Sequence, residues 1–416
     1  MALACGDGKT GGRGVMQTFV GGQVFLPDQC VETTVSVADG AIVDIGGPVI
    51  GTEIDARGKI VAPALIDVHG DAFERQLMPR PGVFFPTDAA LLDTDRQLAA
   101  NGIATAYHAI TLSWEPGLRA VDRGWDLMRN MQALAPRLLV ENRVQLRWET
   151  FAFEALELID WALQGPLTPA LAFNDHTSMS MRAFDTRVQD RPFELASDFS
   201  IASFDDARLR QRTAGNAKRA GLSEEAYIAR LRQVWDRRSD VPATIAAVAQ
   251  KARAAGAPML SHDDTRAETR RWFRDLGATV AEFPMVMAAA EEARKGGDSL
   301  IFGAPNAARG ASHIGSLSAS DMVEAGLCDA LASDYFYPAM LAAIARLDAE
   351  KRADRLALWQ LVSQGPARTM HLHDRGQITK GLRADLVVLD WPAGHPPAVM
   401  GTWVAGRPAF RAIAAG

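Results

Sequence analysis

Short apolar, β-branched runs alternate repeatedly along this chain with longer helical stretches such as Thr87–Asn101 and Thr244–Ala255. This alternation is typical of βα units that build a parallel sheet. Eight such runs are present, which is the number that closes a (β/α)8 barrel of the TIM type. The predicted strands are Ile60–Ile66, Ile103–Ala109, Arg143–Trp148, Leu171–Asn174, Met259–Ser261, Thr279–Glu282, Leu300–Gly303 and Ala330–Ser333.

Both ends of the chain have a different pattern, in which short strands are separated by turns. Asp39-Gly40 and Gly46-Gly47 interrupt alternating runs near the N-terminus, as in β-hairpins. Gly381–Asp390 and Val399–Val404 suggest a turn and further strands near the C-terminus. Because neither end is long enough to bury a core alone, we expect the two to pair into one small β-sandwich domain.

These patterns divide the chain into three parts. Residues 16–60 and 376–416 are predicted to form the β-sandwich, and residues 61–375 the barrel. A charged insertion interrupts the barrel at about 181–240 and includes a predicted helix over Ser223–Arg237. Residues 1–15 are Gly-rich and are expected to be a disordered leader, with Met16 as an alternative start.

Composition excludes several functional classes. The chain has 416 residues and a net charge of −6, which does not favour a nucleic-acid partner. Its three cysteines are widely spaced and cannot form a disulfide framework or a thiolate zinc site. No apolar run has the roughly 18 residues of a membrane helix. We therefore expect a cytoplasmic protein without a membrane partner; a homodimer is one assembly compatible with these data.

Histidine and carboxylate side chains follow five of the predicted strands, at the positions where barrel enzymes have their active sites. Imidazole and carboxylate together suit a divalent ion such as zinc, manganese or cobalt. Two such ions side by side would serve hydrolysis. The candidate metal ligands are His69, Asp71, Glu149, His176, His262 and Asp334.

Other polar residues near these strand ends are assigned different roles. Asp67 shares a face with His69 and is expected to orient the ligands. Asp263 and Asp264 are expected to act likewise, although one of them could replace a ligand. His371-Leu372-His373 is a literal His-X-His motif, but it follows the last barrel helix and lies away from the predicted rim.

The residues Val61–His69, which open the barrel between β-rich termini, resemble the amidohydrolase superfamily. The usual first-strand motif there is His-X-His, and here it is His69-Gly70-Asp71. This variant is similar to one branch, the phosphonate-metabolism amidohydrolases of the carbon–phosphorus lyase pathway. The resemblance spans roughly Gln17 to Asp390. It also rests on Pro79–Val83, Leu146-Arg147-X-Glu149, Asp175-His176-Thr177, Ser261–Thr265, Gly303–Asn306, Arg309-Gly310-X-Ser312-His313 and Leu331–Tyr335.

The resemblance implies a role for each candidate ligand. His69 and Asp71 would hold one metal ion, His176 and His262 a second, and Glu149 would bridge them. Asp334 would bind the reacting water and accept its proton. The reaction implied is hydrolysis of a ribose 1-methylphosphonate 5-triphosphate with release of diphosphate.

A triphosphate substrate needs fixed cations, and guanidinium groups bind phosphate with two parallel hydrogen bonds. Arg80 and Arg309 follow the first and seventh strands and are predicted to bind phosphate. His313 could add a donor, and His108 is expected to line the pocket. The insertion carries further arginines, which by default form a solvated face but could form a lid over a polyanion: Arg182, Arg187, Arg191, Arg208, Arg210 and Arg212.

Two other functions remain open on the sequence. The same metal site would serve a C–N hydrolase acting on a cyclic amide, an N-acyl amino acid or a nucleobase, which would need fewer cations in its pocket. The second alternative function is that of an assembly subunit whose barrel has lost catalysis. The six intact candidate ligands argue against this alternative.

Overall fold

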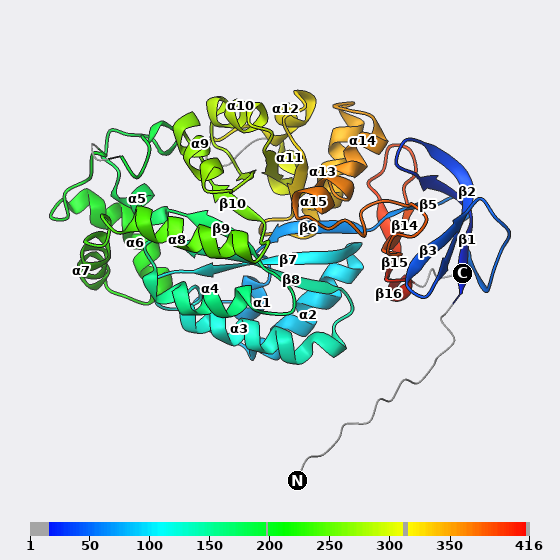
Figure 1. Cartoon of the computed structure of the whole chain (residues 1–416), viewed down its shortest axis with the longest axis horizontal. Helices are drawn as coiled ribbons and strands as arrows, with labels where there is room; N and C mark the ends of the chain where they lie inside the picture. The colour runs from blue at the N-terminus through cyan, green and yellow to red at the C-terminus, as the bar shows by residue number, and fades with distance from the viewer. Residues whose placement is uncertain (1–15, 197–198, 311–314, 413–416) are drawn as a thin grey trace, which may run out of the picture.

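The structure is a computed structural model that describes residues 16–196, 199–310 and 315–412. Its larger part is a barrel of eight parallel strands, hydrogen-bonded in the order β6 to β13 (Figure 1). Gly70 and Asp334 form a parallel bridge that joins the first strand to the last. The predicted (β/α)8 barrel is confirmed. Its strands are β6 Leu65–Gly70, β7 Ile103–Leu112, β8 Glu141–Glu149, β9 Ala170–Asn174, β10 Met259–His262, β11 Val280–Glu282, β12 Ser299–Gly303 and β13 Ala330–Ala332.

Helices surround the barrel and also form the insertion. The α-helices are α1 Glu74–Leu77, α2 Thr87–Ala100, α3 Val121–Leu134, α4 Leu156–Leu163, α5 His176–Met181, α6 Ala207–Ala220, α7 Glu224–Trp235, α8 Val241–Ala254, α9 Ala267–Asp275, α10 Met287–Lys295, α11 Ala304–Arg309, α12 Ala319–Glu324, α13 Ala339–Ala349, α14 Arg355–Gln360 and α15 Gln364–Thr369. No helix within the described ranges is both long and apolar enough to cross a bilayer.

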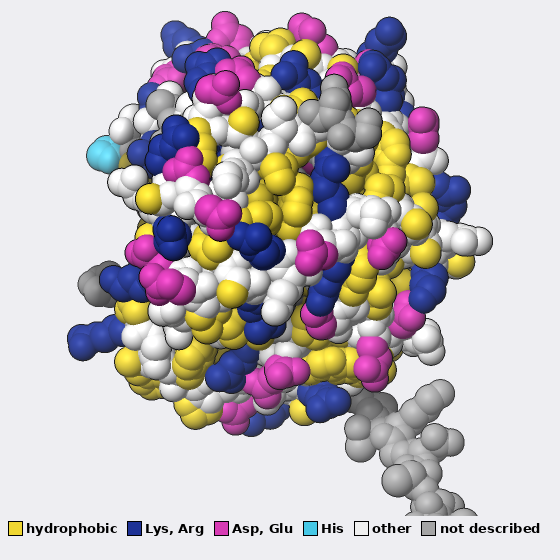
Figure 2. Space-filling model, turned by 90° about the vertical axis from the view of Figure 1, so that its left-hand side faces the viewer, with side chains coloured by type: hydrophobic (Ala, Val, Ile, Leu, Met, Phe, Trp, Pro, Cys, Tyr) yellow, Lys and Arg dark blue, Asp and Glu magenta, His cyan; other side chains and the backbone are white. Residues whose placement is uncertain are grey.

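The insertion contributes α6 and α7, which lie at the end of the molecule opposite the terminal strands (Figure 1). The side chain of Asp206 caps α6 and that of Ser223 caps α7, since each accepts a hydrogen bond from a backbone N–H of the first turn. The predicted helix over Ser223–Arg237 is therefore confirmed. Figure 2 views this end of the molecule and shows basic and acidic side chains interspersed, with hydrophobic side chains between them.

The first predicted barrel strand is in fact two strands, so this prediction was wrong in its bounds. Ile60–Pro63 forms β5, which pairs with β1 and β14 outside the barrel. The backbone N–H of Ala64 still bonds to Asp385, whereas that of Leu65 bonds to Gly102 at the start of the barrel. One continuous apolar run thus supplies a strand to each of two sheets. The hydrophobic period of the sequence alone cannot show at which residue the chain passes from the first sheet to the second.

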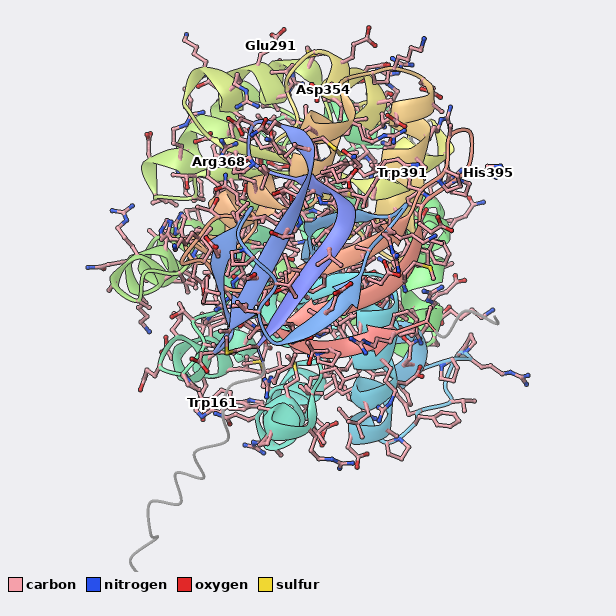
Figure 3. All side chains as sticks on the ribbon, turned by 90° about the vertical axis from the view of Figure 1, so that its right-hand side faces the viewer. Trp161, Glu291, Asp354, Arg368, Trp391 and His395 are labelled. Carbon is pink, nitrogen blue, oxygen red and sulfur yellow. The ribbon has the colours of Figure 1, made fainter. Side chains whose placement is uncertain are left out.

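Strands from both ends of the chain form the second sheet, as predicted (Figure 3). Its hydrogen-bonded order joins C-terminal strands to N-terminal ones through the pairing of β14 with β5. A small core that includes Phe19, Val35 and Trp403 packs within it. The strands are β1 Gln17–Phe25, β2 Cys30–Ala38, β3 Ala41–Ile45, β4 Thr52–Asp55, β5 Ile60–Pro63, β14 Leu386–Asp390, β15 Ala398–Val404 and β16 Arg407–Arg411.

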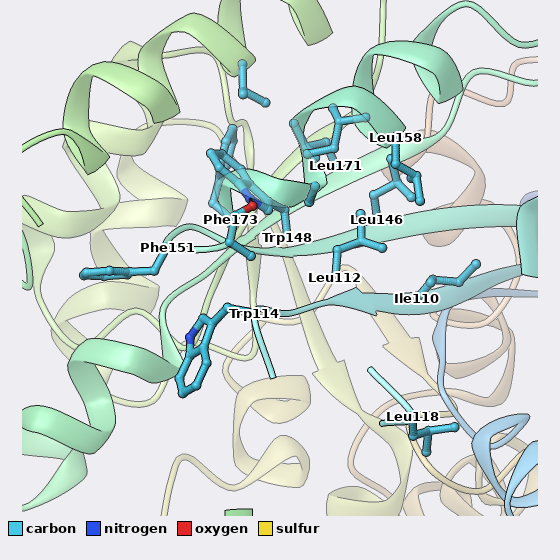
Figure 4. Packing of buried hydrophobic residues seen from close by; sticks show 14 of the residues in the cluster. Ile110, Leu112, Trp114, Leu118, Leu146, Trp148, Phe151, Leu158, Leu171 and Phe173 are labelled. Carbon is cyan, nitrogen blue, oxygen red and sulfur yellow. Dashed lines mark hydrogen bonds between the residues drawn. The ribbon is translucent and has the colours of Figure 1, made fainter. Parts of the chain in front are cut away.

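The side chains of strand β8 alternate between the apolar layer under the helices and the inside of the barrel. Leu146 and Trp148 are buried in the large cluster between strands and helices (Figure 4). The alternate residues Gln145, Arg147 and Glu149 make contacts with side chains from the ends of other barrel strands. Successive strand residues point to opposite faces, so a regular strand supplies packing on one side and polar groups on the other.

Candidate metal centre

The predicted rim brings histidines and carboxylates from different strands into one cluster. The cluster contains three overlapping groups of three residues. Within each group, one possible ligand atom from each residue lies within 4.8 Å of the other two. Because two of the histidines each belong to two groups, the three groups form a continuous row of donors. The groups are His69, Asp71 and Asp334; His69, His262 and Glu282; and His176, His262 and Asp263.

Glu282, the last residue of β11, is a candidate ligand that sequence reasoning missed. One of its carboxylate oxygens lies 2.9 Å from Nδ1 of His69 and accepts a hydrogen bond of 2.6 Å from Gln145. The other oxygen is buried without a hydrogen-bond partner among the described residues and lies 3.8 Å from Nε2 of His262. Burial alone would raise the pKa of this carboxyl, but His69 outweighs it and the pKa lies below its ordinary value.

A signal for Glu282 was present in the sequence, because it ends a predicted strand like the other candidates. A buried, unpaired carboxylate oxygen is costly unless a cation satisfies it. Together with the imidazoles of His69 and His262, this oxygen makes a donor set that fits a divalent ion.

Glu149, which is predicted to bridge two metal ions, contacts His176 through both oxygens of its carboxylate. Its two carboxylate oxygens lie 2.5 Å from Nδ1 of His176 and 3.0 Å from the backbone nitrogen of the same residue. Glu149 belongs to none of the three candidate groups found among the described residues. By engaging Nδ1, it leaves Nε2 of His176 directed toward Asp263, at 3.9 Å. In this arrangement Glu149 is positioned to orient the candidate ligand His176, as carboxylates next to metal-binding histidines often do; its bridging role stays a prediction.

Asp334 is held where the barrel closes. Its backbone N–H donates to His69 and its carbonyl accepts from Asp71, both at 2.9 Å. Its φ of +54° is in the left-handed region, as are those of Asp263 and Phe283 after two other strands. Burial, together with the charge of Asp71, raises the pKa of the Asp334 carboxyl to about 6.

Asp67 holds the backbone of His69 and Ser333 together, as expected from its position two residues before His69. Its carboxylate accepts hydrogen bonds from the backbone N–H of Ser333 at 2.9 Å, from the Ser333 hydroxyl at 2.5 Å and from the backbone N–H of His69 at 3.3 Å. Asp67 therefore ties the first barrel strand to the residue before Asp334.

A cavity of about 360 Å³ opens beside the cluster and is lined by Glu149 and His176. Four arginines also line it: Arg119, Arg182, Arg212 and Arg219. Arg182 and Arg212 come from the insertion, so this part of the chain faces the candidate site. Arg147, which shares a face of β8 with Glu149, lies 3.2 Å from Asp71.

The three predicted substrate residues that the structure describes do not line this cavity. Arg80 and Arg309 are exposed, and neither is among the residues that line the cavity. His108 is buried, and its Nε2 lies 2.6 Å from the side-chain oxygen of Asn142. His313 lies outside the described residues. The assignment of these four to substrate therefore stays a prediction.

The histidines set aside on sequence grounds are not part of the cluster. His371 and His373 follow α15 and are exposed. His395 is exposed as well, near the C-terminal strands (Figure 3).

A closed barrel with imidazoles and carboxylates at the carboxyl ends of its strands has the architecture of a barrel hydrolase. The amidohydrolase family model matches residues 184–410, more than half of the chain. The sequence is 31% identical over 354 residues to the alpha-D-ribose 1-methylphosphonate 5-triphosphate diphosphatase of Escherichia coli strain K12, a match covering 82% of this chain and 86% of that protein. The chain therefore belongs to the amidohydrolase family.

Several solved structures have the same fold. An amidohydrolase from an environmental sample of the Sargasso Sea has a TM-score of 0.61 at 15% identity, covering 95% of this chain and 93% of that chain. A D-hydantoinase from Bacillus sp. AR9 has a TM-score of 0.60 at 12% identity, covering 95% of each chain. An adenosine deaminase from Xanthomonas campestris, solved with bound zinc, has a TM-score of 0.58 at 14% identity, covering 94% and 92%. At these identities the likeness shows the fold alone.

Proposed function

We propose that this hydrolase is a diphosphatase that releases diphosphate from a ribose 1-methylphosphonate 5-triphosphate. The observation that carries the proposal is the cavity in which four arginines line the wall beside the candidate metal ligand His176. Fixed cations of this kind neutralise a polyphosphate and the charge that develops during its hydrolysis. The similarity to the Escherichia coli diphosphatase supports the same substrate class.

We propose two divalent ions per chain, zinc in the first instance. His69, Asp71 and Asp334 would hold one, and His176, His262 and Asp263 the other, with Glu282 between the two histidines that the groups share. Bound ions of this type supply an activated water at neutral pH and offset negative charge on phosphoryl oxygens.

The residues of the chain divide the remaining tasks. The arginines would bind and orient the phosphates, and the Asp334 carboxylate would accept a proton from the attacking water. The water oxygen forms a bond to the phosphorus of the first phosphate, and the bond from that phosphorus to the bridging oxygen breaks. The electron pair leaves with the diphosphate, and the proton held on Asp334 passes to solvent.

The cavity does not favour the C–N hydrolase alternative. A neutral amide or nucleobase offers no negative charge to Arg182 and Arg212, the two cavity arginines for which the described residues supply no carboxylate, so their desolvation would be uncompensated. A triphosphate supplies that charge.

Metal analysis joined to a substrate screen tests the proposal. The purified protein should hold close to two divalent ions per chain and should release diphosphate from ribose or nucleoside triphosphates in preference to cleaving N-acyl compounds. Chelated protein should lose this activity and recover it when zinc, manganese or cobalt is restored. A preference for N-acyl compounds over triphosphates would refute the diphosphatase assignment, and a single ordered ion under metal-replete conditions would refute the two-metal assignment.

A further inference from the structure

The four cavity arginines differ in how their charge is balanced. Arg119 donates two hydrogen bonds of 3.0 Å to the carboxylate of Glu74. Arg219 lies 3.6 Å from a carboxylate oxygen of Glu115. Within residues 16–196, 199–310 and 315–412, Arg182 and Arg212 have no carboxylate partner. The positive charge of the cavity is therefore concentrated on these two insertion residues.

Backbone carbonyl groups hold this pair in place. Arg182 donates to the carbonyl of Met179 at 2.6 Å and to that of Thr186 at 3.0 Å. Arg212 donates to the carbonyls of Ser180 and Arg182 at 3.0 and 2.5 Å. Carbonyl oxygens fix the guanidinium groups without neutralising them. Burial, followed by the nearby charges of Arg212 and Arg191, lowers the pKa of Arg182 to about 10, which indicates an environment short of negative charge.

The position of the pair relative to the candidate ligands is set by one helix. α5 begins at His176 and is followed directly by Arg182. Its six residues rise about 9 Å at roughly 1.5 Å per residue. Arg182 therefore lies one short helix away from the candidate ligand His176, and both residues line the same cavity. Arg212 also lines this cavity and donates a hydrogen bond to the backbone carbonyl of Arg182.

From this arrangement we infer that Arg182 and Arg212 form a subsite for the distal phosphates of a polyphosphate, those that leave as diphosphate. This inference rests on the proposed function and gives it an orientation: the scissile phosphate lies at the metal ligands and the leaving group lies against the insertion. The insertion thereby selects substrates by the length of their phosphate chain. A triphosphate reaches the pair, whereas a monophosphate bound at the metal ligands does not.

Arg208 provides a matched control on the same helix. Its guanidinium group and that of Arg212 both lie over the ring of Phe184, at 4.2 and 4.4 Å from its centroid. Arg208, however, is paired with Asp206 at 2.7 Å and does not line the cavity. Replacing Arg208 removes the same kind of side chain and the same ring contact without removing a cavity cation.

The test is calorimetric titration of the metal-replete, full-length protein with inorganic triphosphate and with orthophosphate, with metal content measured before and after. Arg182→Gln and Arg212→Gln should each weaken triphosphate binding by about ten- to a hundredfold, the loss expected for charge-assisted hydrogen bonds. Arg208→Gln should bind triphosphate like the parent. Arg182→Lys and Arg212→Lys should recover part of the affinity, because an ammonium keeps the charge but not the fork geometry. Orthophosphate binding should be nearly unchanged in all variants.

The outcomes separate the subsite from the proposed function. If Arg182→Gln and Arg212→Gln, or alanine variants where a glutamine variant does not fold, bind triphosphate within about twofold of the parent, the subsite is refuted. That result would leave a measured diphosphatase activity of the parent standing. If the glutamine variants lose triphosphate binding while the parent hydrolyses no organic triphosphate, the subsite stands and the diphosphatase assignment is refuted.

Discussion

Asp334 belongs both to the closure of the barrel and to the candidate metal cluster. Its main chain pairs with His69 and Asp71 to close the barrel, and its carboxylate belongs to the first candidate metal group. Asparagine tolerates the left-handed conformation that this position requires, so Asp334→Asn should keep the fold and at least one metal ion.

The same substitution should lower turnover by roughly several orders of magnitude, because an amide cannot accept the proton of the attacking water. Steady-state kinetics, with circular dichroism and metal analysis as controls, measures this. If turnover falls by less than about tenfold, or about 1.4 kcal/mol of barrier, Asp334 is not the proton acceptor.

A single substitution can also test whether Glu282 is a metal ligand. Glu282→Gln keeps the size of the side chain and an oxygen that can accept from His69 and Gln145. It replaces the unpaired, buried carboxylate oxygen by an NH2 group, which cannot bind a cation. Metal affinity, measured by competition with a chromogenic chelator, should fall by about tenfold or more.

Glu291 is exposed on α10 and offers the control for this experiment (Figure 3). Glu291→Gln removes the same charge away from the rim and should leave metal affinity unchanged. Equal affinities of Glu282→Gln and the parent protein would show that Glu282 is not a ligand.

Among the elements, the insertion contacts the candidate metal centre through the buried side chain of Arg191. Arg191 pairs with Glu194 at 2.5 Å and donates a hydrogen bond of 2.6 Å to the carbonyl of Asp263. Asp263 has a φ of +59° and belongs to the third candidate group. The insertion therefore helps to hold a candidate ligand in a left-handed backbone conformation, besides lining the cavity.

Arg191→Met should destabilise the protein by about 3–5 kcal/mol, because it leaves Glu194 buried without its partner. The double variant Arg191→Met/Glu194→Gln should regain most of that stability, which urea unfolding measures. Its metal affinity should nevertheless stay below that of the parent protein, since the carbonyl of Asp263 still lacks its donor. A double variant that binds metal like the parent would show that Arg191 has only a structural role.

At the scale of the whole molecule, a cluster of charges joins the barrel to the terminal sheet. Glu141, at the start of β8, lies 3.0 Å from Arg375 and also pairs with Arg143 and Arg383. Burial alone would raise the pKa of the Glu141 carboxyl, but Arg375, Arg143 and Arg383 outweigh it and lower the pKa to about 2.

A carboxyl whose pKa is lowered on folding stabilises the protein above its unfolded pKa, and the stabilisation is lost as pH falls through the folded pKa. The loss should therefore occur between pH 4.5 and about 2 and amount to roughly 3 kcal/mol at most. Glu141→Gln should be less stable than the parent at pH 7, and the difference should shrink as pH falls through this window. Unfolding free energies from urea titrations across this range measure it; a difference that does not change with pH would contradict the assignment.

Much of the fold could be read from local patterns. The alternation of strands and helices predicted the barrel, and the turn-rich ends predicted a sheet shared by both termini. The error at Ile60–Ile66 arose because β5 and β6 are both apolar and nearly continuous in sequence. Only hydrogen-bond partners, which lie far away in the chain, distinguish the strand of one sheet from that of the other.

Local patterns were enough to predict the architecture and the kinds of side chain at the rim, because strand and helix periods are local and barrel strands end at one face. Which of those side chains meet depends on how the chain packs in three dimensions. This packing placed Glu282 against His69 and turned Glu149 toward His176. It also brought the insertion arginines, rather than Arg80 or Arg309, to the cavity. The reason is physical: each of these contacts joins residues distant in sequence, and they form only when the barrel closes and the insertion packs against its rim.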